Sequence, residues 1–308
     1  MECLTTDLPF RIAGGLSSGA IIALIALGYT LVYGVLQLIN FAHSEIFMIG
    51  TLTGLLFTTW ATETLTGIPG IVILFIGIIP AMLVSGFSAV ALERIAYRPL
   101  RRRGAPRLSY LISAIGASLF IANLVRIWRG SNPESYPQLL KVQDVIEIGN
   151  MSFSNRDLII IAVSLTMMVG LDQFVRRSRL GRGIRSVAQD AETASLMGVN
   201  PSRVVSLTFF LGGAMGGVAG LMFGFAFGRQ VFDIGFLVGV KAFTAAVLGG
   251  IGSIRGAMLG GLSLGLIESI SAGCFGTQWK DVSAFVILVL VLMFKPTGLL
   301  GTGQGQKL

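Results

Sequence analysis

The sequence has few charged residues: Asp, Glu, Lys and Arg make up 12% of its 308 residues, whereas hydrophobic residues make up 53%. A soluble domain carries about a quarter charged residues. Half of that fraction, together with repeated apolar runs long enough to cross a bilayer, excludes an ordinary soluble domain. The composition therefore predicts an all-α, polytopic protein in contact with membrane lipid.

Histidine, cysteine and nucleotide-binding motifs are also scarce. His43 is the single histidine, which excludes a His-rich metal site. Cys3 and Cys274 match no metal-ligand spacing. Both are expected on the outer side, which allows a disulfide, but we expect them to be unpaired. The sequence contains no G-x-x-x-x-G-K-[ST] motif, so this chain has no ATP-binding loop of its own. No nucleophile–base set is visible, so the sequence predicts a protein that is not an enzyme and holds no metal or cofactor.

The arginines gather in two short segments between apolar runs. One cluster holds Arg94, Arg98, Arg101, Arg102, Arg103 and Arg107, and the other holds Arg176, Arg177, Arg179, Arg182, Arg185 and Arg203. A groove for single-stranded nucleic acid interleaves aromatic side chains with its cations, and these segments have almost none. Basic loops beside membrane spans instead mark the cytoplasmic side. The net charge of +8 is therefore a topology signal, and we predict no nucleic-acid partner.

The order of apolar runs and arginine clusters predicts a topology. The runs cover residues 12–36, 46–60, 69–92, 108–127, 158–175, 205–227, 234–251, 257–272 and 282–294. We predict about eight transmembrane helices in one domain spanning residues 1–308, with the N-terminus outside and the C-terminus cytoplasmic. The acid-bearing loop 129–156 then lies outside and the loop 176–203 inside. Two runs are ambiguous: the second is short unless it begins near Asn40, and the region 234–253 is either a full span or a re-entrant pair.

Glycines recur every four residues in one of these runs, at Gly212, Gly216, Gly220, Gly224 and Gly228. Residues four apart lie on one helix face, so the run has a flat stripe where another backbone approaches closely. We interpret the stripe as helix packing inside one subunit. A contact between subunits, or a gating contact, is the alternative.

Ionisable residues inside the apolar runs are costly and mark functional sites by default. Lys241 and Glu268 lie in two successive runs at similar depths, so we predict an ion pair between them. The pair is either part of a translocation path or a structural ion pair near the outer surface. Both interpretations stay open on the sequence.

The polar patch before the second run poses a similar choice. Asn40 is placed to cap the following helix, with Glu45 in its positive first turn, and His43 lies between them. We favour this capping role. The alternative is a broken helix whose polar groups line the translocation path.

The stretch SVAQDAETASLMGVNPSRV (186–204) is charged and alanine-rich between apolar runs. A helical reading places Val187, Ala191, Ala194 and Met197 near one face, with Gln189, Asp190 and Glu192 largely away from it. Gly198 supplies a C-terminal stop, and Asn200 and Pro201 prevent continuation. The apolar face lacks a Trp or Phe that would enter lipid, so we predict a short amphipathic helix that docks in a protein groove.

The segment from Glu192 to Gly198, ETASLMG, resembles the E-A-A-x-x-x-G coupling loop of the permeases of bacterial ATP-binding-cassette (ABC) importers. Other segments look like the branched-chain amino acid permease family: GYTLVYGVLQLINFAHSEIFMIG (28–50), LERIAYRPLR (92–101), RLGRGIRSVAQDAETASLMGVN (179–200), AAVLGGIGSIRGAMLGGLSLGLIES (245–269) and KPTGLLG (295–301). Together they cover essentially the whole chain. The family usually has glycine where this chain has Ser44, and alanine is commoner at Thr193. These departures leave the family match intact.

The resemblance implies a permease subunit in a bacterial inner membrane. Two separate ATPase subunits would bind ATP and Mg²⁺, a second homologous permease would complete the path, and a periplasmic binding protein would deliver the substrate. Glu192, Ala194 and Gly198 would transmit the force of the ATPases, with Gln189 and Asp190 in support. Relatives import leucine-type amino acids, broader neutral amino acids, amides or urea, so the substrate stays open.

Two further classes of function compete with an ATP-driven permease. In an ion-gradient transporter or channel, Lys241, Glu268 and Glu45 would relay ions. In a scaffold subunit, changing these charges would leave transport intact. The coupling motif favours the ATP-driven permease, because an ion-gradient transporter has no ATPase to bind.

Overall fold

The computed structural model describes residues 8–148, 151–295 and 297–301, which are mostly helical. The long helices are α1 (Leu8–Leu36), α2 (His43–Thr64), α3 (Gly70–Leu92), α5 (Arg107–Arg129), α6 (Asn155–Arg177), α9 (Pro201–Phe227), α10 (Ile234–Gly249), α11 (Ile254–Phe275) and α12 (Lys280–Phe294). The short segments are the π-helix η2 (Glu93–Tyr97), α4 (Arg98–Arg102), α7 (Arg179–Gln189), α8 (Ala191–Leu196) and the 3-10 helix η3 (Thr277–Trp279).

Four short strands accompany the helices, and the sequence did not predict them. They are β1 (Glu134–Ser135), β2 (Asp144–Ile148), β3 (Met151–Ser154) and β4 (Arg229–Gln230). β1 pairs with β4 and β2 pairs with β3, both antiparallel. The helical fold class is confirmed, with these strands as a small addition in the connecting loops.

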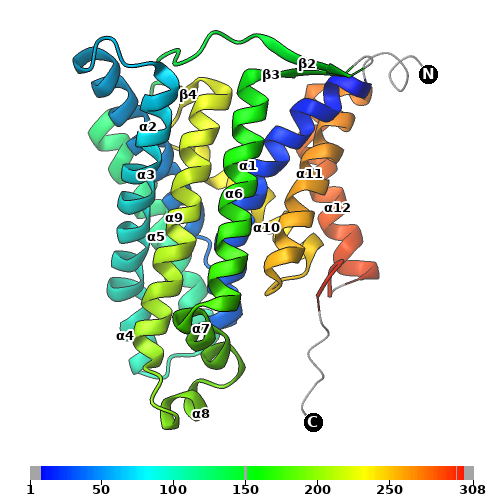
Figure 1. Cartoon of the computed structure of the whole chain (residues 1–308). Coiled ribbons are helices and arrows are strands. Elements are labelled where there is room, and N and C mark those ends of the chain that lie inside the picture. Colours follow the sequence, from blue (N-terminus) through cyan, green and yellow to red (C-terminus); the bar gives the residue numbers. More distant parts are fainter. Residues whose placement is uncertain (1–7, 149–150, 296, 302–308) are drawn as a thin grey trace.

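The helix bundle has two ends that carry different elements (Figure 1). One end, hereafter the hairpin end, carries the β2–β3 pair and the start of α1. The opposite end, hereafter the α8 end, carries α4, α7 and α8. The two arginine-rich segments therefore lie at the same end of the molecule, as the sequence predicts.

Helix α9 packs closely against other helices because its glycines allow backbones to approach. Gly212 contacts Gly28 of α1, and Gly220 contacts the backbone of Phe47 and Thr51 in α2. A second row of α9 glycines faces α3. The predicted helix-packing stripe is thus used inside this chain.

Two members of the stripe differ from this pattern. Gly224 lies against the ring of Tyr136, which comes from a loop rather than from a helix. Gly228 has a positive φ of 69° and open space beside it, and it caps the end of α9. The packing role predicted for Gly228 is therefore wrong, because the helix has already ended there.

Close approach also joins α1, α10 and α11. Gly261 and Gly265 of α11 lie against Ala23 and Gly19 of α1, and Gly260 lies against Ala245 of α10. α1 is consequently packed between α9 and α11, and its middle is almost completely buried.

Seven of the described helical segments are long and apolar enough to cross a membrane. α2 is not among them, and α10 is a shorter apolar helix of 16 residues. Because α10 is one continuous helix, the re-entrant pair considered for 234–253 does not form. The count of about eight spans is not confirmed. Eight crossings would also leave both termini on one side, in conflict with the opposite sides that we predicted.

Cys274, near the end of α11, is disulfide-bonded. The expectation of an unpaired thiol is therefore wrong at this position. Cys3 lies outside the described residues. The disulfide that the sequence left open at this position is the observed state, and such a bond depends on proximity in space and not on separation along the chain.

Candidate functional sites

The first candidate site lies where the chain stops being helical between α1 and α2. α1 ends at Leu36, Gln37 has a positive φ of 53°, and α2 begins only at His43. Positive φ is uncommon in residues other than glycine. His43 lies beside Gly216, well inside α9, so the non-helical segment is within the bundle. The chain is therefore non-helical between α1 and α2, and α2 begins at a buried position inside the bundle.

Asn40 has a different partner from the one predicted. The N-cap of α2 is Ala42, which makes no side-chain cap. Asn40 is buried, and its Oδ1 accepts a 2.7 Å hydrogen bond from the hydroxyl of Tyr97 in the π-helix η2. The capping role of Asn40 is wrong, because a buried donor from another helix occupies the amide oxygen.

His43 packs between aromatic and glycine surfaces in the middle of the bundle. Its ring meets the Tyr29 ring edge-on, with centroids 4.9 Å apart and an interplanar angle of 71°. On its other sides it contacts Gly28 and Gly216, which leave room for the imidazole. The side chain is only 1% exposed. The glycine stripe of α9 therefore also accommodates this ring.

Glu45 lies in the first turn of α2, as predicted, and is 2% exposed. Its Oε1 accepts a hydrogen bond from Ser118 Oγ of α5 at 3.0 Å. Ser44 Oγ lies 3.4 Å from the same oxygen but donates its shorter hydrogen bond, 2.7 Å, to the Phe41 carbonyl. Its Oε2 has no hydrogen-bond partner and faces Gly235 in the first turn of α10. Among the described residues, no basic nitrogen lies within ion-pair distance of this carboxylate.

Glu45 thus lies close to the N-terminal ends of two helices, α2 and α10. The partial positive charge at a helix N-terminus favours an anion nearby, by about 0.3–1 kcal/mol and up to about 2 kcal/mol in partly buried geometries. That is small beside the several kcal/mol that burial of a carboxylate costs. Oε2 of Glu45 is therefore available to a cation or a hydrogen-bond donor.

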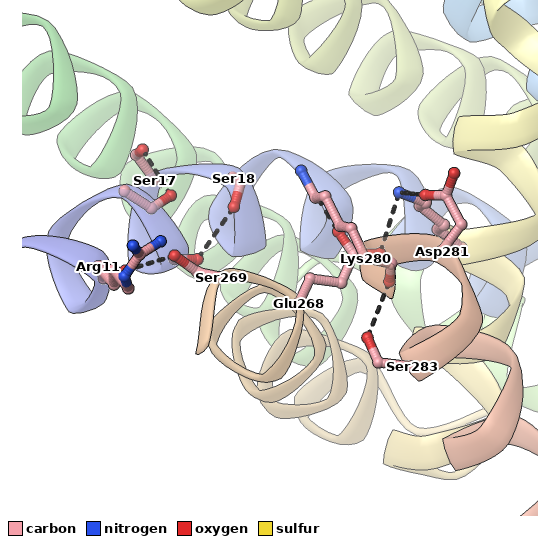
Figure 2. Close-up of polar contacts among 11 residues, drawn as sticks. Arg11, Ser17, Ser18, Glu268, Ser269, Lys280, Asp281 and Ser283 are labelled. Carbon is pink, nitrogen blue, oxygen red and sulfur yellow. Dashed lines mark hydrogen bonds and ion pairs between the residues drawn. The ribbon is translucent and has the colours of Figure 1, made fainter. Parts of the chain in front are cut away.

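The second candidate site is a group of four charged residues on α10, α11 and α12. Lys241 Nζ lies 3.2 Å from Glu268 Oε1, so the predicted ion pair is present. The same Nζ lies 2.5 Å from Asp281 Oδ1, and Lys280 Nζ lies 3.7 Å from Glu268 Oε2. Figure 2 shows Glu268 on α11 beside Lys280 and Asp281 at the start of α12. We call these four residues the charge cluster.

The charge cluster joins three helices and neutralises itself. It holds two cations and two anions, and Glu268, its most buried member, is in contact with both lysines. The next residue, Ser269, donates a 2.6 Å hydrogen bond to the backbone oxygen of Arg11 in α1 (Figure 2). Among the described residues, no hydrogen bond or ion pair connects the charge cluster with Asn40, His43 or Glu45. The structure places the five path candidates in two separate sites.

The third candidate site is the segment from α7 to α8, which is two helices and not one. Asp190 has an extended backbone, with φ −158° and ψ 108°, and separates them. Its carboxylate accepts hydrogen bonds from the Glu192 and Thr193 amides at 2.9 and 3.1 Å, and from the Thr193 hydroxyl. The predicted single helix is wrong here, because an aspartate that caps a new helix ends the preceding one.

Ala194 attaches α8 to the rest of the protein. It is 5% exposed and packs in an apolar group with Ile184, Val187 and Val204. Gln189 and Glu192 are exposed, as predicted, and Gly198 ends the turn with a φ of 84°. Val204 belongs to α9, so this small core connects α8 to the helix that packs against α1, α2 and α3.

Three exposed apolar residues at α8 were missed or misplaced in the sequence analysis, and one of them is Ala191, which was predicted on the inner face. Met197 was predicted on the inner face, but it is 80% exposed, and the neighbouring Leu196 is 83% exposed. The helix break at Asp190 changes the phase of the following turn, which turns Met197 outward. An apolar pair at the tip of a solvent-facing turn is a signal for a protein contact.

The family model described as "Branched-chain amino acid transport system / permease component" matches residues 11–292. The chain belongs to this permease family. The high-affinity branched-chain amino acid transport system permease protein BraD of Pseudomonas aeruginosa is 43% identical over 301 residues, which cover 96% of this chain and 97% of that protein. The corresponding permease protein LivH of Escherichia coli K12 is 43% identical over 297 residues, or 95% of each chain. No solved structure matches.

Membership of this permease family agrees with the helices. The family model extends over all seven candidate spans except for the last residues of α12. The protein is therefore a multi-pass membrane protein and the permease component of a transport system. The family match does not by itself assign roles to Glu45, the charge cluster or α8.

Proposed function

We propose that this chain is the membrane subunit of an ATP-driven importer of branched-chain amino acids, energised by separate ATPase subunits. The observation that carries the proposal is the 43% identity to permeases of that substrate class over nearly the full length of the chain. Amides or urea are the alternative cargo within the same type of importer. ATP and Mg²⁺ would be bound by the partner ATPases, and none of the chemistry of hydrolysis falls to this chain.

We place the α8 end in the cytoplasm and the hairpin end outside. The arginines of α4 and α7 lie at the α8 end, and the positive-inside rule puts such clusters on the cytoplasmic side. A periplasmic binding protein would then deliver the substrate at the hairpin end. A second, homologous permease would supply the other wall of the path, with residues 1–308 acting as one permease domain.

In this proposal an ATPase subunit binds α8. Leu196 and Met197 offer an apolar tip, and Glu192 a charge, at a surface where nothing in the described chain covers them. Ala194 anchors α8 against Val204, so a displacement of α8 is passed to α9. α9 in turn packs against α1 and α2 through glycines. A small movement of α9 would therefore displace the non-helical residues 37–42 between these two helices.

The break between α1 and α2 is our preferred segment of the translocation path. Non-helical backbone within a membrane protein is tolerated where it is buried in protein or lines a cavity. Glu45 adds a carboxylate that no cation among the described residues compensates. An amino acid in transit carries an ammonium group that would fill this place, and the substrate carboxylate would need a different site.

The test is ATP-dependent uptake by the complex reconstituted with its ATPases and binding protein. We expect leucine, isoleucine and valine to be transported and to compete with one another, with urea and amides as poor competitors. Glu192→Lys should abolish uptake and weaken ATPase binding, whereas Glu63→Lys, the same change at an exposed site near the other end of the bundle, should leave ATPase binding unchanged. Uptake that persists without ATP but follows an ion gradient would contradict the proposal.

A further inference from the structure

A cavity of about 380 Å³ lies at the hairpin end, outside the sites described so far. Its lining consists of the loop 136–142, Arg156 at the start of α6, and residues 225–228 at the end of α9. Pockets that hold small molecules have volumes of about 300–1,000 Å³. The cavity is therefore large enough for a small ligand and too small for a folded partner.

The charge of the lining is positive. Arg156 and Lys141 are its two ionisable cations, and no lining residue is acidic. Arg156 donates one hydrogen bond, from Nη1 to the Ala226 carbonyl at 2.9 Å, while its Nε is buried without a hydrogen-bond partner. In the described part of the chain, no carboxylate lies within ion-pair distance of this guanidinium. A guanidinium that lines a cavity and pairs with no carboxylate of the described chain is suited to bind a carboxylate through charge-assisted hydrogen bonds.

The remaining walls are mostly apolar. Leu139, Leu140 and Val142 come from the loop, and Phe225 and Phe227 come from α9. A ligand that satisfies both parts of the cavity carries a carboxylate at one end and an aliphatic group at the other. This combination is the chemistry of an apolar α-amino acid.

Tyr136 separates the cavity from the interior of the bundle. It lines the cavity, yet it is only 7% exposed. Its ring fills a notch between Gly54 of α2 and Gly224 of α9, where a side chain at either position would collide with it. Its hydroxyl donates to the backbone oxygen of Thr51, two turns along α2 from His43 and Glu45. The phenol ring therefore fills the space between the cavity and the start of α2.

We propose that this cavity is an entry site for the amino acid, in which Arg156 binds the carboxylate, the loop and α9 hold the aliphatic side chain, and Tyr136 closes the way into the bundle. The proposal rests on the proposed function, because it takes the substrate class from there. It assigns to the permease itself a first contact with the free amino acid, before the substrate reaches Glu45.

The test uses the assembled complex in nanodiscs of phosphatidylcholine, without binding protein. A thiol is introduced by Val142→Cys, at an exposed residue that lines the cavity, and its rate of reaction with a maleimide is compared with that of the parent chain. Saturating leucine should slow the reaction, whereas leucinamide, which lacks the carboxylate, should not. Val145→Cys, an exposed position on β2 outside the cavity, should react at the same rate with and without leucine.

The role of Arg156 is tested in the same assay. Arg156→Gln should raise the leucine concentration needed for half-protection by roughly tenfold or more, because a hydrogen bond to a charged group is lost. Arg229→Gln, at an exposed arginine on β4 outside the cavity, should leave it unchanged. If Arg156→Gln prevents assembly, the leucine–leucinamide comparison still decides the matter.

Each of the following outcomes would contradict the proposed entry site. Equal protection of the Val142→Cys thiol by leucine and leucinamide would show that the site does not bind the carboxylate. Protection by phosphatidylglycerol in the nanodisc, with no effect of leucine, would identify a lipid headgroup site. Protection that requires the binding protein would identify a docking contact. A wild-type complex that transports no amino acid contradicts the proposed function, whereas a complex that transports leucine without protecting Val142→Cys contradicts only the entry site.

Discussion

The charge cluster and the Glu45 site both bury carboxylates within the helix bundle, but they satisfy them differently. Glu268 lies between Lys241 and Lys280, and Asp281 pairs with the same Lys241. In the described part of the chain, Glu45 accepts a hydrogen bond from Ser118 on one oxygen, has no donor on the other and pairs with no cation. Among the described residues, cations pair with Glu268 and none pairs with Glu45.

This difference suggests different roles for the two sites. A compensated group of charges joins helices and is strongly destabilised when one member is removed. An uncompensated carboxylate is costly to the fold and is retained where it meets something that the chain alone does not supply. We therefore assign the charge cluster to structure and Glu45 to transport.

The largest effect that we expect is on the stability of the charge cluster. Lys241→Met leaves Glu268 buried with only the more distant Lys280, and should lower the free energy of unfolding by about 3–5 kcal/mol. Thermal unfolding of the purified protein in detergent measures the loss. The double variant Lys241→Met/Glu268→Met, which leaves one cation (Lys280) and one anion (Asp281) of the cluster, should recover most of it, and a double variant as unstable as the single one would contradict the compensation.

Glu45→Gln should act on transport instead of stability. The amide keeps the size of the side chain and removes the charge, so we expect folding to be unchanged or improved. Uptake of leucine should fall by roughly 10- to 100-fold, the loss of one hydrogen bond to a charged group. Uptake by the reconstituted complex and thermal unfolding of the same sample measure the two effects, and a variant that is unstable but transports normally would reverse the comparison.

Gly235→Ala tests the space around Glu45. The new methyl group would lie 2.7 Å from Oε2 and from the backbone oxygen of Ser44, which is closer than carbon and oxygen pack. We expect a destabilisation of about 1–3 kcal/mol and a loss of uptake. Gly34→Ala is the matched control, since open space surrounds that position in α1. Equal behaviour of the two variants would mean that α10 does not confine Glu45.

The smallest effect should come from Tyr97→Phe, which removes the hydrogen bond to Asn40. We expect a destabilisation of about 0.5–1.5 kcal/mol. The readout is proteolysis or hydrogen exchange in residues 37–42, which should increase more than exchange in α12. No change in that segment would show that the tyrosine does not hold the broken helix in place.

The features that the sequence could predict follow from local periodicity. Four-residue spacing identified the face of α9 that α1 and α2 approach, and equal depth in two successive spans identified the Lys241–Glu268 pair. Gly198 was predicted as a helix stop because only a few residues adopt its backbone conformation easily. Each of these rests on one helix or on two neighbouring ones.

The features that were missed depend on competition between local structures or on partners far along the chain. The sequence analysis placed Asp190 on the surface of one helix. Its carboxylate instead accepts hydrogen bonds from the backbone amides of Glu192 and Thr193, which ends that helix and starts a new one. Asn40 is bound by Tyr97 from another helix, and Gly224 by Tyr136 from a loop. The spacing of residues along α2 or α9 does not predict these contacts with distant parts of the chain.

The most direct test of the account compares two complexes in one assay: ATP-driven leucine uptake per folded transporter for Glu45→Gln and for Lys241→Met/Glu268→Met. We predict that the first loses uptake roughly 10- to 100-fold while remaining stable, and that the second transports close to the wild-type rate. Normal uptake by Glu45→Gln together with lost uptake by the double variant would contradict the assignment of the path to the helix break.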